Sequence, residues 1–284
     1  PATSAADAVR LAAECLRLNG AESPGREAVV MWAALAGTTP GAVWAGRDAP
    51  APEDLVLRLH EAVSRRIAGE PLAYAVGLAG FRTLDLVVDR RVLIPRPETE
   101  GLVDRVLAWA RGRWPAGAPW GSVLDLGTGS GCIALSLAVE GKFTRIVATD
   151  VSADALAVAR LNAERTRRAT WLELRQGSLL EPLGGAQFDV IVSNPPYLTT
   201  AEFERLDGSV RDFEPAIALH AGADGLDQTR AMLRSAGDYL AAGGLLALEV
   251  DCHRAALALS EARGAGWKDA RIEADLWGRQ RYLL

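Results

Sequence analysis

The spacing of hydrophobic positions changes about a quarter of the way along the chain. Over residues 4–70, apolar side chains recur every three or four positions, which is the spacing of amphipathic helices. Asn19-Gly20, Pro40 and the Ala-Pro-Ala-Pro run at 49–52 interrupt this pattern. The segment therefore predicts a small all-helical unit.

Three helices carry most of this pattern. The first helix has an apolar face made of Ala8, Leu11, Ala12, Cys15 and Leu16. The second covers Ala28–Leu35, because Ser23 followed by Pro24 is typical of a helix start. The third ends near Gly69 and has an apolar face made of Leu55, Leu57, Leu59, Val63 and Ile67.

The pattern changes between residues 70 and 95, where we place the domain junction. From Phe81 to Val92, apolar and polar positions alternate, which predicts a strand or hairpin. The following segment, Ile94–Glu100, contains Pro95 and Pro97, which permit neither a continued strand nor a continued helix. We expect an ordered turn that leads into the next helix.

From Ser122 onward, short apolar runs alternate with helical patterns. The predicted strands are Val123–Leu126, Ile146–Asp150, Trp171–Gln176, Asp189–Ser193, Leu245–Val250 and a segment near Arg281–Leu284. The predicted helices include Ile133–Glu140, Ala153–Arg165 and Gln228–Leu240. Such alternation is typical of an α/β fold, in which helices cover both faces of a mainly parallel sheet.

Composition narrows the class of protein. The 284 residues are 49% hydrophobic and 24% charged, which excludes a mainly disordered chain, and the net charge of −5 disfavours stable binding to nucleic acid. No uncharged apolar run approaches the roughly 18–20 residues of a membrane span, and charges interrupt any signal-peptide core in the first twenty residues. Three scattered cysteines offer neither a disulfide framework nor metal-ligand spacing. We therefore expect a cytoplasmic protein without a metal site.

A glycine-rich loop lies between the first predicted strand of the sheet and the helix after it. It has the sequence Asp125-Leu126-Gly127-Thr128-Gly129-Ser130-Gly131. Glycines there let the backbone bend tightly and approach a ligand, while the amide groups of the helix start point toward it. The simpler alternative is a tight turn that binds nothing.

Two features indicate which ligand such a loop would take. The Gly-x-Gly-x-Gly spacing differs from the Gly-x-Gly-x-x-Gly preferred for a dinucleotide, and Asp125 would be a poor neighbour for phosphate. Asp150, at the end of the next strand, can accept both hydroxyls of a ribose; alternatively, it is only an acid before the helix start at Ser152. Together these residues resemble the S-adenosylmethionine site of class I methyltransferases.

The strand Phe188–Ser193 runs directly into Asn194-Pro195-Pro196-Tyr197. A planar amino group is a poor nucleophile, but the Asn194 side-chain oxygen and the Pro195 carbonyl can each accept one of its N–H groups. The prolines stiffen the loop, and Tyr197 can stack on a flat amide or base. The alternative is a proline turn with Tyr197 as a packing residue. No residue that could act as a strong general base stands in a recognisable motif. We therefore expect catalysis by positioning and electrostatic stabilisation.

The tetrapeptide alone cannot distinguish an amide from adenine, but the wider sequence resembles one family. It is similar to the glutamine-N5 methyltransferases of peptide chain release factors. The matching stretches are Arg65-Arg66, Gly69–Tyr74, Val92–Glu100, the glycine loop, Asn194–Tyr197, Glu214-Pro215 with Ala218-Leu219, Gly222 with Asp224–Leu226, and Asp275-Leu276 with Gly278-Arg279 and Arg281.

The resemblance implies methyl transfer from S-adenosylmethionine, which becomes S-adenosylhomocysteine, to the glutamine of the Gly-Gly-Gln motif of a class 1 release factor. The cofactor would contact Asp125, Gly127, Thr128, Gly129, Ser130, Gly131, Asp150, Ser178, Leu179 and Asn194. The glutamine amide would be held by Asn194, Pro195, Pro196 and Tyr197. The site would be covered by Arg96, Pro97, Glu98 and Thr99, unless these residues form only a linker and a helix start.

The family's fold implies a Rossmann-like, mixed but mainly parallel, seven-stranded sheet. A helical substrate-recognition domain (1–75) and a β-hairpin linker (76–95) would precede the methyltransferase domain (96–284), and we expect a monomer without a membrane partner. The chain departs from the family pattern after Glu249, where it continues Val250–Arg254. Three alternatives remain: an adenine-N6 methyltransferase of DNA or RNA, a glutamine methyltransferase of a ribosomal protein, and a binding module without activity.

Overall fold

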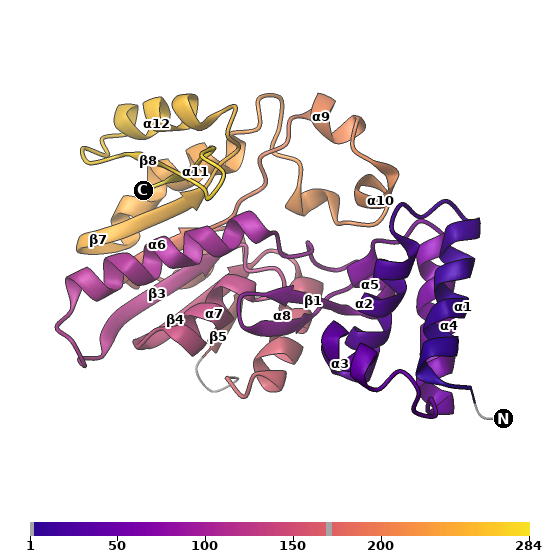
Figure 1. Ribbon diagram of the computed structural model, residues 1–284. Helices are drawn as coiled ribbons and strands as arrows, with labels where there is room; N and C mark the ends of the chain where they lie inside the picture. The colour runs from indigo at the N-terminus through magenta and orange to yellow at the C-terminus, as the bar shows by residue number, and fades with distance from the viewer. Residues whose placement is uncertain (1–2, 169–171) are drawn as a thin grey trace. The chain divides into compact units, whose positions relative to one another are not determined.

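The computed structural model of the protein describes residues 3–168 and 172–284. The chain divides into two compact units. The first combines the initial 78 residues with residues 207–213, and the second comprises residues 79–206 and 214–284. Figure 1 shows the helices and strands of both.

The first unit is helical, as predicted. Its helices are α1 (Ala5–Leu18), α2 (Pro24–Ala36), α3 (Pro40–Ala45), α4 (Glu53–Ile67) and α5 (Leu72–Val76), joined by the short α10 (Gly208–Arg211). The predicted apolar faces were partly wrong, because Leu11 and Leu57 are 50% and 62% exposed, whereas Leu16 and Leu59 are buried. Burial follows the positions that face a neighbouring helix, and hydrophobicity alone does not identify these.

Residues 207–213 come from the middle of the sequence that forms the second unit. They belong with the helical unit, where the ring of Phe213 lies against Gly69: a Cβ at that glycine would be 3.7 Å from the ring. This arrangement differs from the expected continuous segment 96–284. No local pattern in 207–213 indicates the contact, since the packing partner lies far away in the sequence.

The second unit begins with a two-stranded hairpin, β1 (Leu78–Phe81) and β2 (Leu84–Val87), followed by α6 (Pro97–Arg113). Arg82 occupies the hairpin turn with φ of 54°. Its guanidinium bonds to both carboxylate oxygens of Glu140 at 2.6 and 2.7 Å, and its amide N–H donates to the Glu100 carboxylate at 2.8 Å. Arg82 thus anchors the hairpin to two helices, through its side chain and its main-chain N–H.

A seven-stranded mixed sheet forms the centre of this unit, which confirms the predicted fold class. Its strands are β3 (Trp120–Leu126), β4 (Phe143–Asp150), β5 (Leu172–Gln176), β6 (Phe188–Ser193), β7 (Leu240–Glu249), β8 (Ile272–Ala274) and β9 (Gln280–Leu283). They lie in the order β5-β4-β3-β6-β7-β9-β8, and β9 runs antiparallel to both of its neighbours. Trp171, the predicted first residue of one strand, lies outside the described residues.

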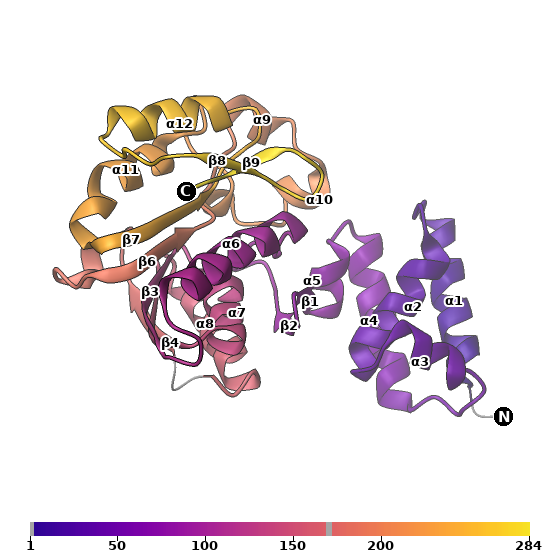
Figure 2. The ribbon, with the colours of Figure 1, turned by 60° about the vertical axis from the view of Figure 1, so that its left-hand side comes forward.

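Helices cover both faces of the sheet (Figure 2). One face carries α6, α7 (Cys132–Glu140) and α8 (Ala153–Arg165), and the other carries α11 (Asp227–Ser235) and α12 (Ala255–Gly264). The unit also contains the short α9 (Thr200–Glu204) and the 3-10 turns η2 (Glu181–Leu183), η3 (Ala216–Ala218) and η4 (Ala236–Tyr239). Val123 packs with side chains of α6 and α7, whereas the next residue, Leu124, packs with those of α11 and α12. This is the alternation expected of a strand buried on both sides.

The predicted helix Gln228–Leu240 was too long. Helix α11 ends at Ser235 and continues only as a 3-10 turn, and Leu240 already pairs with Phe188 as the first residue of β7. The strand is correspondingly longer than the predicted Leu245–Val250. Pairing with a neighbouring strand outweighs the helical pattern here, because the sheet satisfies backbone groups that the helix would otherwise satisfy.

Candidate active site

The carboxyl ends of β3, β4 and β6 meet at one edge of the sheet, where the predicted motifs come together. A cavity of about 280 Å³ opens there within the second unit. Among the predicted site residues, those lining it are Gly127, Gly129, Asp150, Ser178, Leu179, Asn194, Pro195 and Pro196. Residues up to 69 positions apart in the sequence therefore share one cavity, at the place where open α/β sheets bind ligands.

The glycine loop has the left-handed backbone that favours glycine. Gly127 and Gly129 have φ of 69° and 55°, and a Cβ at either position would meet nothing within 4 Å. The main chain at these residues is therefore open to a ligand. At Gly131, in contrast, a Cβ would lie 3.2 Å from a methyl group of Leu135, so this glycine allows close packing at the start of α7.

Asp150 lines the cavity and also supports the loop. One of its carboxylate oxygens accepts the Gly129 N–H at 2.9 Å, and the other accepts the Ser152 N–H at 2.9 Å, at the start of α8. Each oxygen keeps a further lone pair, because a carboxylate oxygen can accept two hydrogen bonds. The residue can therefore hold the helix start and still bind hydroxyl groups from the cavity.

Three polar residues of the loop are buried and are not among the residues that line the cavity: Asp125, Thr128 and Ser130. One oxygen of Asp125 accepts the Thr128 hydroxyl at 2.7 Å and the Ala134 N–H at 3.2 Å. Burial raises the pKa of Asp125 to about 7, and the nearby charge of Asp150 adds to this effect. In this structure Asp125 holds the loop in shape and its carboxylate does not reach the cavity.

Helix α8 supports the loop from the other side through Asn162. This fully buried side chain accepts the Val87 N–H at 2.7 Å and donates to the Val87 carbonyl at 3.0 Å and to the Ser130 carbonyl at 2.9 Å. Asn162 therefore joins β2, α8 and the glycine loop with three hydrogen bonds. It stands within a helical pattern, where nothing in the sequence distinguishes it from a surface residue.

Asn194 leaves the end of β6 with its side chain in a defined orientation. Its Nδ2 donates to the Thr99 hydroxyl at 3.0 Å, while its Oδ1 is buried and has no hydrogen-bond partner among residues 3–168 and 172–284. A buried acceptor without a donor costs free energy, unless a ligand supplies one. Tyr197 does not line the cavity, and burial raises the pKa of its hydroxyl.

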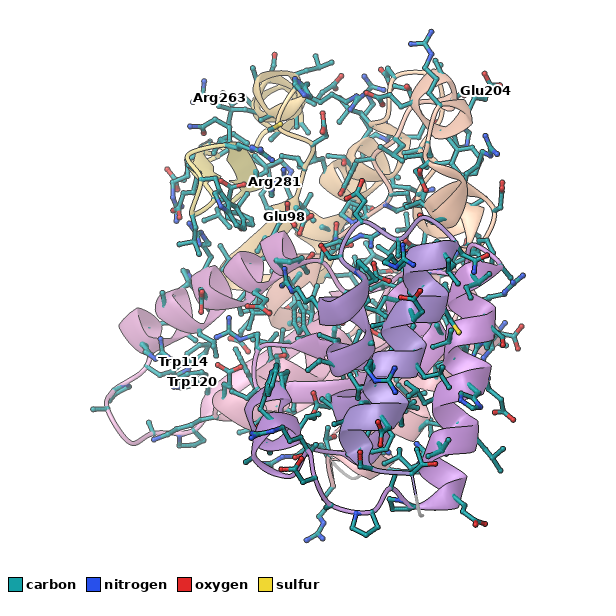
Figure 3. The ribbon with its side chains drawn as sticks, turned by 45° about the vertical axis from the view of Figure 1, so that its right-hand side comes forward. Glu98, Trp114, Trp120, Glu204, Arg263 and Arg281 are labelled. Atoms are coloured by element: carbon teal, nitrogen blue, oxygen red, sulfur yellow. The ribbon has the colours of Figure 1, made fainter. Side chains whose placement is uncertain are left out.

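The segment before α6 approaches the same region. Arg96 pairs with the buried Glu214 at 2.6 Å, and the other oxygen of Glu214 accepts the Ile94 N–H at 3.1 Å. Thr99, in the first turn of α6, contacts Asn194 as described above. Glu98 at the start of α6 lies near Arg281 of β9 (Figure 3), and its carbonyl accepts the Tyr282 hydroxyl at 2.7 Å.

Glu249, the last residue of β7, was not among the predicted site residues. It is fully buried, and neither of its carboxylate oxygens has a hydrogen-bond partner in the described part of the chain. Burial raises the pKa of Glu249 to about 7, whereas the nearby Thr99 hydroxyl and Arg281 lower it. An acid that ends an otherwise apolar strand is the one signal by which the sequence could have indicated it.

The departure from the family pattern after Glu249 forms a local cluster of charges. Arg254 pairs with Asp251 at 2.7 Å and with Glu202, and it donates to the Asp224 carbonyl at 2.9 Å. These residues therefore tie the loop after β7 to the segments that follow β6. Separately, no helix formed by the described residues is long and apolar enough to cross a membrane.

Two protein families match parts of the chain. The PrmC N-terminal domain matches residues 7–77, and the methyltransferase small domain matches residues 116–206. These segments fall in the helical unit and in the sheet that carries the cavity, respectively.

Relatives match along most of the chain. The release factor glutamine methyltransferase of Geobacter sulfurreducens is 42% identical over 221 residues, which cover 78% of this chain and 75% of the relative. That of Cereibacter sphaeroides is 37% identical over 279 residues, covering 98% and 97%. The solved N-terminal domain of human METTL16, in complex with SAH, has a TM-score of 0.54 at 17% identity and covers 89% of this chain and 91% of its own, a likeness of fold alone.

Proposed function

The chain belongs to the release factor glutamine methyltransferase family, and from this premise we propose its reaction. It transfers a methyl group from S-adenosylmethionine to the side-chain amide nitrogen of the glutamine in the Gly-Gly-Gln motif of a class 1 peptide chain release factor. The observation that carries this proposal is that Asn194, which lines the cavity, has a buried Oδ1 with no hydrogen-bond partner in the described part of the chain.

The cavity at the glycine loop supports the cofactor. The open main chain at Gly127 and Gly129 admits a ligand, and Asp150 has lone pairs free to accept ribose hydroxyls. Ser178 and Leu179 form another part of the wall. When bound, S-adenosylmethionine supplies a methyl group on a positively charged sulfur, which leaves as a neutral thioether.

Asn194 and Pro195 support an amide as the substrate. The lone pair of a primary amide is delocalised into its carbonyl, so the site must hold the nitrogen in a reactive orientation. Asn194 Oδ1 would accept one N–H and the Pro195 carbonyl the other, while Pro196 stiffens the loop and Tyr197 packs beside the flat amide. The nitrogen then releases a proton to water. Arg96, Pro97 and Glu98 would cover the site, with Arg96 held by Glu214.

Mass spectrometry of a purified class 1 release factor tests the proposal. After incubation with the protein and S-adenosylmethionine, the peptide with Gly-Gly-Gln should gain the mass of one methyl group on its glutamine. A release factor whose glutamine is replaced by alanine is the matched control and should gain none. An unmodified Gly-Gly-Gln peptide would contradict the proposal.

Two variants separate the assigned roles. Asn194→Ala should lower kcat roughly 100- to 1000-fold, as expected for the loss of one preorganised polar group, and should leave the Kd for S-adenosylmethionine within about threefold. Asp150→Ala should instead weaken cofactor binding first, measured by calorimetry. Equal losses of cofactor binding and turnover in Asn194→Ala would show that the assignment of Asn194 to the substrate is wrong.

Adenine remains the second candidate substrate, because its planar amino group fits the same two acceptors. Transfer of a radiolabelled methyl group into DNA or RNA, and none into release factor, would favour it. A release factor as substrate places the protein in the cytoplasm, in agreement with its scattered cysteines, and we propose that it acts as a monomer.

A further inference from the structure

Two buried acceptors that have no donor among residues 3–168 and 172–284 lie near Thr99. The first is Oδ1 of Asn194, a residue that lines the cavity, and the second is the carboxylate of Glu249 at the end of the neighbouring strand β7. Thr99 itself is 1% exposed. Its hydroxyl accepts the Nδ2–H of Asn194, and its position lowers the pKa of Glu249, so it contacts one residue and lies near the other.

A hydroxyl group has one proton to donate, and the bond from Asn194 uses only an acceptor site of Thr99. That proton therefore remains for a neighbouring acceptor. We propose that Glu249 is a positioning residue for methyl transfer, whose carboxylate accepts the Thr99 hydroxyl and thereby holds Asn194 with Oδ1 toward the substrate amide. This inference rests on the proposed function.

We call the chain of hydrogen bonds from Glu249 through Thr99 to Asn194 the relay. The direction in which each group donates fixes the orientation of the Asn194 amide. An ionised carboxylate can only accept, so it forces Thr99 to donate toward it and to accept from the Nδ2 of Asn194. Asn194 must then present Oδ1 to the site. Without this constraint the amide could turn over and present Nδ2–H to the N–H groups of the substrate, an arrangement in which two donors face each other. Each bond in such a chain also strengthens the next.

Protonation of Glu249 would remove this direction, because a carboxylic acid can donate to Thr99. The titratable and charged groups that act on Glu249 come from several elements: Arg96 and Glu98 at the start of α6, Cys132 on α7, Tyr197 after β6, and Arg281 and Tyr282 on β9. Burial raises the pKa of Glu249 to about 7. The relay should therefore form progressively as pH rises through about 7 and be lost as pH falls through the same range.

The test uses the full-length protein, a Gly-Gly-Gln release factor and S-adenosylmethionine. Glu249→Gln and Thr99→Val should each lower kcat at pH 8 roughly 10- to 100-fold, the cost of a lost buried hydrogen bond, with the Kd for S-adenosylmethionine within threefold. Thr99→Ser keeps the hydroxyl and should stay within threefold of wild type in kcat. The control Glu273→Gln removes a half-exposed carboxylate of β8 and should change nothing.

Two further readouts distinguish positioning from a merely structural role. The double variant should be no slower than Thr99→Val alone, because both changes break one relay. The wild-type kcat should fall as pH drops below about 7, and Glu249→Gln should lose this acidic limb. If Glu249→Gln does not fold, the comparison of Thr99→Val with Thr99→Ser decides the question.

Three results would overturn the inference while the proposed function stands: wild-type kcat and pH profile in Glu249→Gln, additive losses in the double variant, or Thr99→Ser as slow as Thr99→Val. A wild-type protein that methylates no release factor would instead overturn the proposed function and this inference with it.

Discussion

Replacing Asn162 by alanine should destabilise the second unit more than any ordinary surface change. The substitution removes three hydrogen bonds of 2.7–3.0 Å and leaves both main-chain groups of Val87 and the carbonyl of Ser130 without their partner. Each buried polar group left unsatisfied costs about 1–3 kcal/mol. Allowing for partial access of water to β2, we expect the free energy of unfolding to fall by about 3–5 kcal/mol.

Urea denaturation followed by tryptophan fluorescence measures this loss. With a slope of about 3 kcal/mol/M, the midpoint should shift by roughly 1–1.7 M. The matched control is Asn19→Ala, which removes one exposed hydrogen bond to the Cys15 carbonyl and should cost about 0.5–1 kcal/mol. Binding of S-adenosylmethionine to Asn162→Ala should also weaken, because the Ser130 carbonyl anchors the glycine loop. A loss no larger than that of Asn19→Ala would refute the reasoning.

Two other predictions concern the same region. Gly131→Ala should lower the free energy of unfolding by about 2–3 kcal/mol, because φ is 83° and the new Cβ would lie 3.2 Å from Leu135. The control Gly237→Ala should be nearly neutral, since a Cβ there meets nothing within 4 Å. Equal melting temperatures of the two variants would contradict this prediction. The raised pKa values of Asp125 and Glu249 mean that the folded protein binds more protons than the unfolded chain between about pH 4 and 7. Stability should therefore fall as pH rises through this window, by roughly 1–4 kcal/mol per carboxyl, and Asp125→Asn should flatten the fall in urea midpoints measured from pH 5 to 8.

Local patterns were sufficient for the framework of the second unit. Alternating strands and helices predicted the sheet, and helix α8 begins and ends at the predicted residues, Ala153 and Arg165. The glycine loop and Asn194 were found because each follows a strand directly, so their position at the edge of the sheet is a consequence of local sequence. The same reasoning failed at Gln228–Leu240, where a strand partner distant in sequence determines the backbone.

The supporting contacts of the site could not be predicted in this way. Thr99 and Asn194 are 95 positions apart, and Asn162 and Val87 are 75 apart. Thr99 was expected to cover the site, but its role as a partner of Asn194 depends on how α6 crosses the sheet. Glu249 is marked in the sequence only as an acid at the end of an apolar strand, and only the fold shows that its carboxylate is buried without a hydrogen-bond partner among residues 3–168 and 172–284.

The division of the chain into interleaved units affects how it can fold during synthesis. The helical unit includes residues 207–213, yet 128 residues of the second unit separate them from its other part. At about 5–20 residues per second, a ribosome takes roughly 6–25 seconds to make that intervening segment. During this interval the nascent helices lack the side chain of Phe213 against Gly69, so the first unit to be translated cannot be the first unit to be finished.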